Sequence, residues 1–272
     1  MLFLVSVISI LVSRVWSAPA QFDWGLSDNE EPVASNIAIQ ATLNCGRLVR
    51  GLNNADCQYM QKIGFSNQGV NAQSTNGKAW IGNNAPYTFT FINRASKPSP
   101  VPVTVVIWVR DGSNDYTSMD MRHRRPTITY SLPRVGDKVT IAMPANVNGA
   151  FAALTDHKTT LHFTGQIYNT WGEFSTGKWA TVDVSREVNM NGNVMEMKAS
   201  NGCVSNMNRC VFKCKSGNTC GARGTYLLQN CESGSQPGAG RGNDPFTHDP
   251  SGGCGGWGYH GKGHVDVSLG RN

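Results

Sequence analysis

The 272-residue chain is long enough to form one large or two small domains with a substantial hydrophobic core. It carries 24 Lys and Arg residues against 18 Asp and Glu residues, which is a formal net charge of +6. In a secreted protein this charge favours acidic glycans, cell walls or membrane surfaces as partners, and we expect no nucleic-acid partner. The alternative is a solvated basic surface that serves solubility.

The N-terminus predicts export. Residues 2–12 form an apolar run, and small residues at 17–20 offer a cleavage site, so residues 1–20 are interpreted as a secretory signal peptide. The run is too short to span a bilayer core of about 30 Å. No later segment is long and apolar enough to do so, and we therefore expect a secreted, extracellular protein without a transmembrane segment. Residues 21–35 contain acids but no Lys or Arg and predict a disordered leader.

The central part of the chain predicts an all-β fold. A short helix is expected within residues 45–60, in an N-terminal extension of the domain. Runs of alternating and β-branched residues then predict strands, at residues 87–92, 101–109, 127–132, 138–143, 149–154, 160–163, 181–185 and 194–198. Strands that recur about every 8–15 residues between Gly, Pro, Asn and Asp are typical of a β-sandwich, which we place at residues 36–200.

Cysteine dominates the next segment. An even number of cysteines behind a signal peptide predicts disulfides, up to four of them. The eight are Cys45, Cys57, Cys203, Cys210, Cys214, Cys220, Cys231 and Cys254. Cys45 and Cys57 are the favoured local pair, and the other six allow fifteen arrangements. The spacing of the later cysteines does not match a two-by-two zinc site.

Two C-terminal segments follow the sandwich. Residues 201–231 predict a small disulfide-rich subdomain. Residues 232–272 are rich in glycine and predict irregular or partly disordered structure before a final strand at 264–269.

Three other groups of residues suggest chemistry only weakly. His260 and His264, with His248 and Asp249, contain metal-ligand types, but no helix holds them in place, so a solvated tail is favoured and no metal or cofactor is expected. No Gly-x-Ser-x-Gly motif is present, so the main signal of a serine hydrolase is missing. The basic cluster at 122–125 is interpreted as a solvated loop, with an anionic partner as the alternative.

The most informative feature is a pair of acids. Glu173 lies in a predicted tight turn within Thr-Trp-Gly-Glu-Phe, and Asp183 lies on the alternating strand Thr-Val-Asp-Val-Ser. Two nearby carboxylates can perform acid/base chemistry, hold a sugar or cap turns. Trp171 and Trp179, with Trp108, offer aromatic faces for sugar contact, and the alternative for these side chains is core packing.

Four short motifs resemble, in the same order, a block of the thaumatin-like (osmotin-like) proteins. They are Thr-Trp-Gly-Glu-Phe-Ser at 170–175, Val-Asp-Val-Ser at 182–185, Val-Met-Glu-Met at 194–197 and Cys-Val-Phe-Lys-Cys at 210–214. Upstream, residues 87–94 and 104–108 look like the opening hairpin of that family. Residues 135–198 are also similar to a group of secreted fungal allergens with a Thr-Trp-Gly-Glu-Phe motif. The chain departs from the thaumatin-like pattern in having eight cysteines where that family usually has sixteen.

The thaumatin-like resemblance implies a β-sandwich with a cleft lined by acids, which in that family binds β-glucans and in some members has weak glucanase activity. Carried over by position, the family's turn glutamate falls on Glu173 and its strand aspartate on Asp183. A further family aspartate meets Trp179 or Ala180, so at most two of the cleft acids are retained, and the alignment near Arg110 is too loose to assign the cleft arginine.

Two hypotheses from different classes follow. The first is a non-enzymatic secreted protein that binds a cell-wall polysaccharide or a host extracellular protein, as a fungal virulence effector or a defence-type protein does. The second is a weak endo-β-1,3-glucanase that uses Glu173 and Asp183. The loss of a family cleft acid favours the first.

Overall fold

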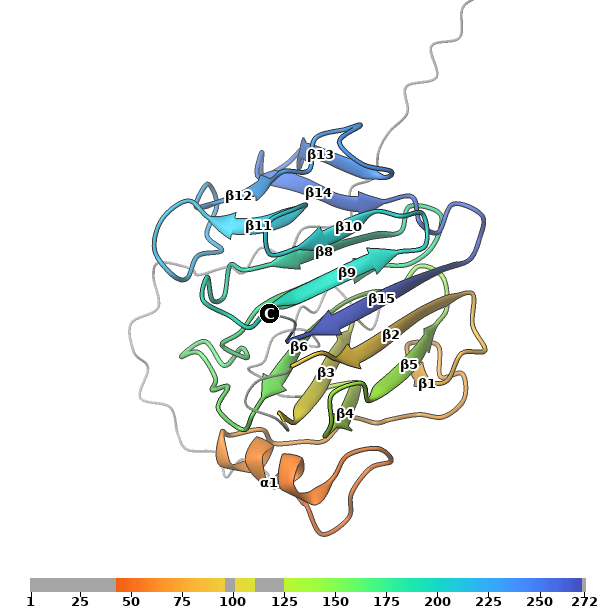
Figure 1. Ribbon diagram of the computed structural model, residues 1–272, viewed down its shortest axis with the longest axis vertical. Helices are drawn as coiled ribbons and strands as arrows, with labels where there is room; N and C mark the ends of the chain where they lie inside the picture. The colour runs from red at the N-terminus through yellow and green to blue at the C-terminus, as the bar shows by residue number, and fades with distance from the viewer. Residues whose placement is uncertain (1–42, 96–100, 111–124, 271–272) are drawn as a thin grey trace, which may run out of the picture.

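The computed structural model, which describes residues 43–95, 101–110 and 125–270, is a sandwich of two mixed β-sheets with one short helix (Figure 1). The elements are α1 (Asn54–Lys62), β1 (Trp80–Ile81), β2 (Tyr87–Asn93), β3 (Val103–Val109), β4 (Ile128–Leu132), β5 (Lys138–Met143), β6 (Asn148–Thr155), β7 (Trp171–Ser175), β8 (Thr181–Ser185), β9 (Met195–Ala199), β10 (Val204–Asn206), β11 (Val211–Cys214), β12 (Tyr226–Gln229), β13 (Ala239–Asn243), β14 (Pro250–Gly255) and β15 (Gly263–Leu269). The predicted all-β sandwich is confirmed. The predicted signal peptide (1–20), the acidic leader (21–35) and most of the basic cluster at 122–125 lie outside the described residues.

The two sheets bring together strands that are distant in the sequence. The six-stranded sheet has the order β1-β5-β2-β15-β9-β10, and the path of the nine-stranded sheet is β12-β11-β8-β7-β6-β3-β4, with β14 pairing to β8 and β13 to β14. Both sheets are mixed because β15 runs parallel to β2 and β11 runs parallel to β8. The last strand of the chain thus completes the middle of the first sheet.

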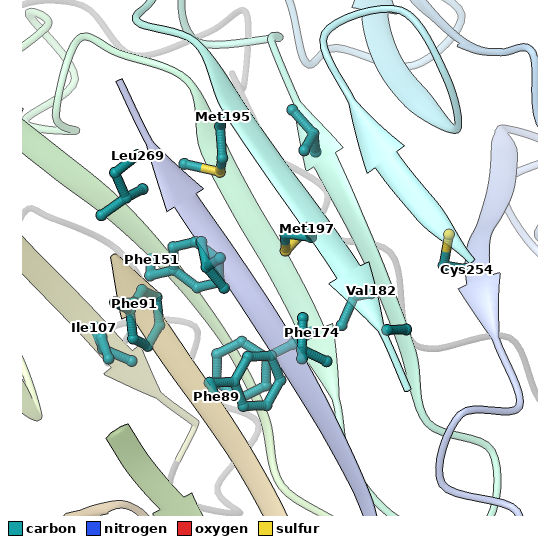
Figure 2. Packing of buried hydrophobic residues seen from close by; sticks show 14 of the residues in the cluster. Phe89, Phe91, Ile107, Phe151, Phe174, Val182, Met195, Met197, Cys254 and Leu269 are labelled. Atoms are coloured by element: carbon teal, nitrogen blue, oxygen red, sulfur yellow. The ribbon is translucent and has the colours of Figure 1, made fainter. Parts of the chain in front are cut away.

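The main core lies between the sheets. In β2, buried residues alternate with partly exposed ones, which turns one face of the strand inward. There Phe91 packs edge-on against Phe151 of β6 at 4.8 Å between ring centroids, and Phe89 packs against Phe174 of β7 at 5.0 Å (Figure 2). These contacts join the six-stranded sheet to the nine-stranded sheet.

A second, smaller core lies on the outer face of the nine-stranded sheet. Side chains of the N-terminal segment, including Tyr59 and Met60 of α1, cover Trp108 and Trp171 there. The helix begins at residue 54 because the side chain of Asn53 accepts a hydrogen bond from the backbone N–H of Asp56 at 2.8 Å. A short helix was predicted within residues 45–60, and the observed helix is α1.

Most predicted strands are confirmed, with shifts of one or two residues at their ends. Two predictions in this region are wrong. Residues 160–163 form no strand, and only an isolated bridge joins Leu161 to Ile167. Glu173 lies within strand β7 rather than in a tight turn. Gly172 suggested a turn, but a Cβ atom at this glycine would lie 2.2 Å from the ring of Phe151, so packing within the strand accounts for the glycine.

The cysteine-rich and glycine-rich segments are also built into the sheets. Strand β10 pairs with β9, β11 with β8, and β14 with β8, so the strands of residues 201–231 extend the main sheets. The final strand is confirmed as β15. The residues ahead of this strand were predicted to be irregular, but they contain the paired strands β13 and β14. Glycine permits this pairing because a Cβ at Gly253 would lie 2.8 Å from the carbonyl oxygen of Val182.

All eight cysteines form disulfides, as predicted. The pairs are Cys45–Cys57, Cys203–Cys254, Cys210–Cys231 and Cys214–Cys220. The favoured local pair, Cys45–Cys57, is confirmed. Four disulfides indicate that the chain folds in an oxidising compartment, in agreement with an extracellular location. Within the described ranges, no helix is long and apolar enough to cross a membrane.

Candidate functional site

The two predicted acids face each other on neighbouring strands. Register across the nine-stranded sheet aligns Trp108 with Ala150, Ala150 with Glu173, and Glu173 with Asp183. Side chains that are directly opposite in antiparallel strands point to the same face, with Cβ atoms about 4.5–5.5 Å apart. One row of the outer face therefore runs from a tryptophan on β3 to two carboxyl groups on β7 and β8.

Two further acids belong to this group. Glu187 follows β8 and Asp249 precedes β14, and both are buried, with 4% and 6% of their surfaces exposed. Asp183 is 5% exposed, whereas Glu173 is partly exposed. We call Glu173, Asp183, Glu187 and Asp249 the acid cluster. Glu173 alone among the four is not buried.

Burial and mutual repulsion change the acidity of Glu173, Asp183 and Glu187. Burial raises the pKa of Glu173 from its ordinary 4.5 to about 7. Burial, followed by the charges of Glu173 and Glu187, holds the pKa of Asp183 well above its usual range. The pKa of Glu187 is raised in the same way, by burial and then by the charges of Glu173 and Asp249. Carboxyl groups in this environment retain protons at a pH at which surface acids have lost them.

Hydrogen bonding does not explain why Asp183 is buried. Its Oδ1 is buried and has no hydrogen-bond partner among the described residues. Asp249, in contrast, accepts a hydrogen bond from the backbone N–H of Gly224 at 2.8 Å. A buried acceptor without a partner costs about 1–3 kcal/mol, so Asp183 is not simply a satisfied scaffold group.

The described residues do not present the acid cluster as a metal centre. Their only group of three His, Cys, Asp or Glu ligand atoms that lie within 4.8 Å of one another is Cys203, Cys210 and Cys254. Those sulfur atoms are already in disulfides.

The tryptophans predicted to contact sugar occupy different environments. Trp171 and Trp108 are fully buried, and their ring centroids lie 5.4 Å apart in the second core. In this structure Trp171 packs in the core and offers no face to a ligand. Trp179, in the turn between β7 and β8, is 49% exposed, and the Nζ of Lys178 lies 5.0 Å from the centroid of its ring.

The histidines of the C-terminal segment are not arranged around a metal. His264 is held by the hydroxyl of Thr88, 2.7 Å from its Nδ1, and by Asp266, 3.2 Å from its Nε2. His260 is exposed. Both residues line a cavity of about 570 Å³ between β9, β14 and β15, which the acid cluster does not line. A second cavity, of about 430 Å³, is lined by Tyr168 and several asparagines and also excludes the four acids.

The sequence provided no signal that Glu187 and Asp249 would join the two motif acids. Glu187 is only four residues from Asp183, but it lies beyond the end of β8, separated from the strand by one residue. Asp249 is 66 residues from Asp183 and joins it only because β14 pairs with β8. The fold thus brings two acids from outside the motifs to the two that the motifs contain.

Comparison with known protein families supports the resemblance to secreted fungal allergens that the sequence analysis identified. The Allergen Asp f 4-like domain matches residues 78–226, which include the segment 135–198 identified above as similar to secreted fungal allergens. No curated protein matches the chain. The matched residues are more than half of the chain and contain both Glu173 and Asp183. The chain therefore belongs to the Allergen Asp f 4-like domain family.

Proposed function

We propose that this protein is an extracellular, non-enzymatic binder of cell-wall glycan, and that Glu173 and Trp179 form the glycan-binding surface, with Asp183 as the buried neighbour of Glu173. The observation that carries the proposal is the environment of Glu173. It is the partly exposed member of a cluster whose other carboxyl groups are buried, and its pKa is raised to about 7.

A carboxyl group with this pKa is suited to binding hydroxyl groups. Near neutral pH it is present in both forms, so it donates a hydrogen bond when protonated and accepts when ionised. Asp183 lies directly across the strand pair and has an oxygen without a partner. In the turn that joins the two strands, Trp179 exposes an aromatic surface of the kind on which sugar rings stack.

The limited solvent access of the carboxyl groups in the acid cluster favours glycan binding over catalysis. A glycoside hydrolase generally uses two carboxyl groups that both reach the scissile bond. Here Asp183, Glu187 and Asp249 are each less than a tenth exposed, and Glu173 is the member that solvent reaches. A single accessible carboxyl group can anchor a sugar, but it does not supply the usual catalytic pair.

A weak endo-β-1,3-glucanase remains the second candidate, because one observation favours it. A general acid needs a pKa near the working pH, and Glu173 has one beside a second carboxyl group. In this case Glu173 would protonate the leaving oxygen and Asp183 would act on the opposite side of the bond.

The resemblance to thaumatin-like proteins supports a glucan as the ligand, and a divergent relationship to that family is part of the proposal. A role as a fungal virulence effector or a defence-type protein would follow from binding at a cell wall. A host extracellular protein is the other partner considered, and the experiment below distinguishes it.

Retention on insoluble β-1,3-glucan tests the binding surface. Wild-type protein is compared with Glu173→Gln, Asp183→Asn and Trp179→Ala. The matched controls are Glu232→Gln, an exposed acid, and Phe163→Ala, an exposed aromatic residue. We expect retention of the wild type and controls. Loss of one hydrogen bond of about 1.4 kcal/mol should weaken binding by Glu173→Gln about tenfold.

Three outcomes decide between the candidates. Retention of all variants at the wild-type level would exclude the acid pair as the glycan site. A lack of retention on every insoluble glucan would shift the assignment to a host protein. Release of reducing sugar by the wild type, but not by the Glu173→Gln, Asp183→Asn double variant, would establish the glucanase instead.

A further inference from the structure

We infer that the cavity at the start of β15 binds the acidic group and ring of an anionic sugar, at a site separate from the acid cluster. Its floor and walls include Ser200, Trp257, Tyr259, His260, Lys262 and His264, and we call it the basic cavity. This inference does not depend on the proposed glycan surface at Glu173.

The basic cavity lies where the connection from β14 to β15 turns back toward the six-stranded sheet, at the right of Figure 1. The disulfide Cys203–Cys254 joins the chain after β9 to β14, just before this connection. Asn201 then donates a side-chain hydrogen bond to the carbonyl of Gly255 at 2.9 Å, and the N–H of Gly263 bonds to the carbonyl of Pro86 at 2.9 Å. These attachments pre-form the cavity, which lowers the entropy cost of binding.

One of the residues that line the cavity, Trp257, has an aromatic side chain fixed by the core. Trp257 is 3% exposed and meets Tyr87 and Phe89 edge-on, with ring centroids at 5.7 Å and 5.6 Å. Its indole N–H is buried and has no hydrogen-bond partner within the described part of the chain. An anchored aromatic ring beside polar side chains is a feature of binding sites that combine an apolar surface with a few polar groups.

Tyr259 provides a second, exposed ring at the rim. It is 62% exposed, and its ring meets that of His260 edge-on at 5.5 Å. An exposed ring held beside a cavity provides stacking area for a sugar ring at a low entropy cost. The volume of about 570 Å³ lies in the range of small-ligand sites.

The charge of the cavity selects the ligand. Lys262 contributes a cationic group and His260 contributes an imidazole that can donate a hydrogen bond, and none of the described residues that line the cavity is Asp or Glu. Asp266 does not line the cavity, and its Oδ1 lies 3.2 Å from the Nε2 of His264. A carboxylate or sulfate on a sugar would gain charge-assisted hydrogen bonds from Lys262 and His260.

The charge of the whole molecule reinforces this preference. The formal net charge of +6 counts every acid as ionised. Each carboxyl group of the acid cluster that retains its proton makes the protein one unit more positive than this figure, which increases the attraction of an anionic polysaccharide. The attraction is general, whereas the cavity provides the place where a sugar ring is held.

Calorimetric titration of the full protein tests the inference with three oligosaccharide probes. Trigalacturonic acid carries carboxylates, a heparin tetrasaccharide carries sulfates, and maltotriose is neutral. We expect one or both acidic probes to bind and maltotriose not to bind. Tyr259→Ala and Lys262→Ala should each weaken binding about five- to tenfold, whereas Tyr259→Phe and Lys262→Arg should preserve most of it.

Two variants control for general effects. Lys62→Ala removes an exposed charge on α1, and Phe246→Ala removes an aromatic residue that is 88% exposed. If these weaken the binding of the acidic probes as much as the cavity variants do, diffuse electrostatic attraction explains the binding and the site is wrong. Equal binding of maltotriose would overturn the acidic class of ligand, and a lack of binding by both acidic probes would overturn the inference.

The two proposals can fail separately. Glu173→Gln should bind the acidic probes as the wild type does, because Glu173 does not line the basic cavity. Tyr259→Ala should remain on β-1,3-glucan. Trp179→Ala is omitted, because the turn before β8 contacts the β14–β15 connection through a hydrogen bond from the N–H of Gly256 to the carbonyl of Ala180 at 2.9 Å.

Discussion

The outer face of the nine-stranded sheet has two halves with opposite chemistry. On the half formed by β3, β6 and Trp171 at the start of β7, the N-terminal segment and α1 cover Trp108 and Trp171 with apolar side chains. On the rest of β7 and on β8, the same face carries Glu173 and Asp183. The change occurs within one row of the sheet, because Ala150 lies between Trp108 and Glu173.

This contrast separates stability from function. The apolar half buries large rings whose removal from water stabilises the fold. The acid half buries carboxyl groups that repel one another, and the Oδ1 of Asp183 lacks a partner, which is unfavourable for stability. Unfavourable groups that persist in an otherwise well-packed face are candidates for function.

The largest predicted effect tests the apolar half. Trp171→Ala should lower the free energy of unfolding by about 3–5 kcal/mol, because it leaves a cavity beside Trp108 in the second core. Urea unfolding followed by circular dichroism measures this change. Trp171→Phe should cost less, since it retains much of the ring. A loss below about 1 kcal/mol would mean that the N-terminal segment does not pack on the sheet as described.

Sequence patterns predicted the strands of the main core well. They predicted less well which residues of the nine-stranded sheet lie on its apolar half and which on its acid half. Alternation in β2 and β5 identified those strands, since β2 has one buried and one partly exposed face and the first four residues of β5 follow the same pattern. In β7 the run Trp-Gly-Glu-Phe suggested a turn, because neither the packing of Gly172 against Phe151 nor the burial of Glu173 can be seen in a local pattern.

The candidate site was predicted only in part for the same reason. Glu173 and Asp183 belong to short motifs and were identified as a pair. Asp249 joins them through pairing between β14 and β8, which is a long-range contact in a glycine-rich segment without an alternating pattern. The exposed position of Trp179 and the buried position of Trp171 likewise depend on which segment covers the sheet, and α1 is distant in the sequence from both.

The second prediction concerns the attachment of the apolar cover. Replacing both members of the Cys45–Cys57 pair by alanine should cost about 3 kcal/mol, since the disulfide closes a loop with a sequence separation of 12. Thermal unfolding of the double variant measures the loss. The single-cysteine variants are unsuitable controls because each leaves a free thiol. Unchanged stability would show that the cover is held by its apolar contacts alone.

The third prediction tests the acid half through pH. The folded-state pKa of Glu173 is raised, so its contribution to stability is fully present below its ordinary pKa of 4.5 and is lost as pH rises to about 7. Since Glu173 is partly exposed, we expect this loss to be about 1–2 kcal/mol. Raised pKa values of Asp183 and Glu187 add a loss of the same sign.

Comparing the wild type with the neutral variant Glu173→Gln isolates the contribution of Glu173 to the pH dependence of stability. The unfolding free energy of wild type minus that of Glu173→Gln should fall between pH 4.5 and pH 7 and then level off. Glu232→Gln, at an exposed ion pair, should show no such fall. A difference that rises with pH would mean that Glu173 is stabilised as a carboxylate, contrary to the repulsion inferred for the acid cluster.

The smallest predicted effect asks whether the two halves are energetically independent. Asn53→Ala removes the N-cap of α1 and should cost about 1 kcal/mol, whereas Asn53→Ser should retain most of the cap because its hydroxyl also accepts from the helix N–H. Because α1 covers the apolar half, the pKa of Glu173, followed by NMR, should be the same in both variants and the wild type. A shift in that pKa on loss of the cap would show that the helix also sets the burial of the acids, and the boundary at Ala150 would then not separate the two halves.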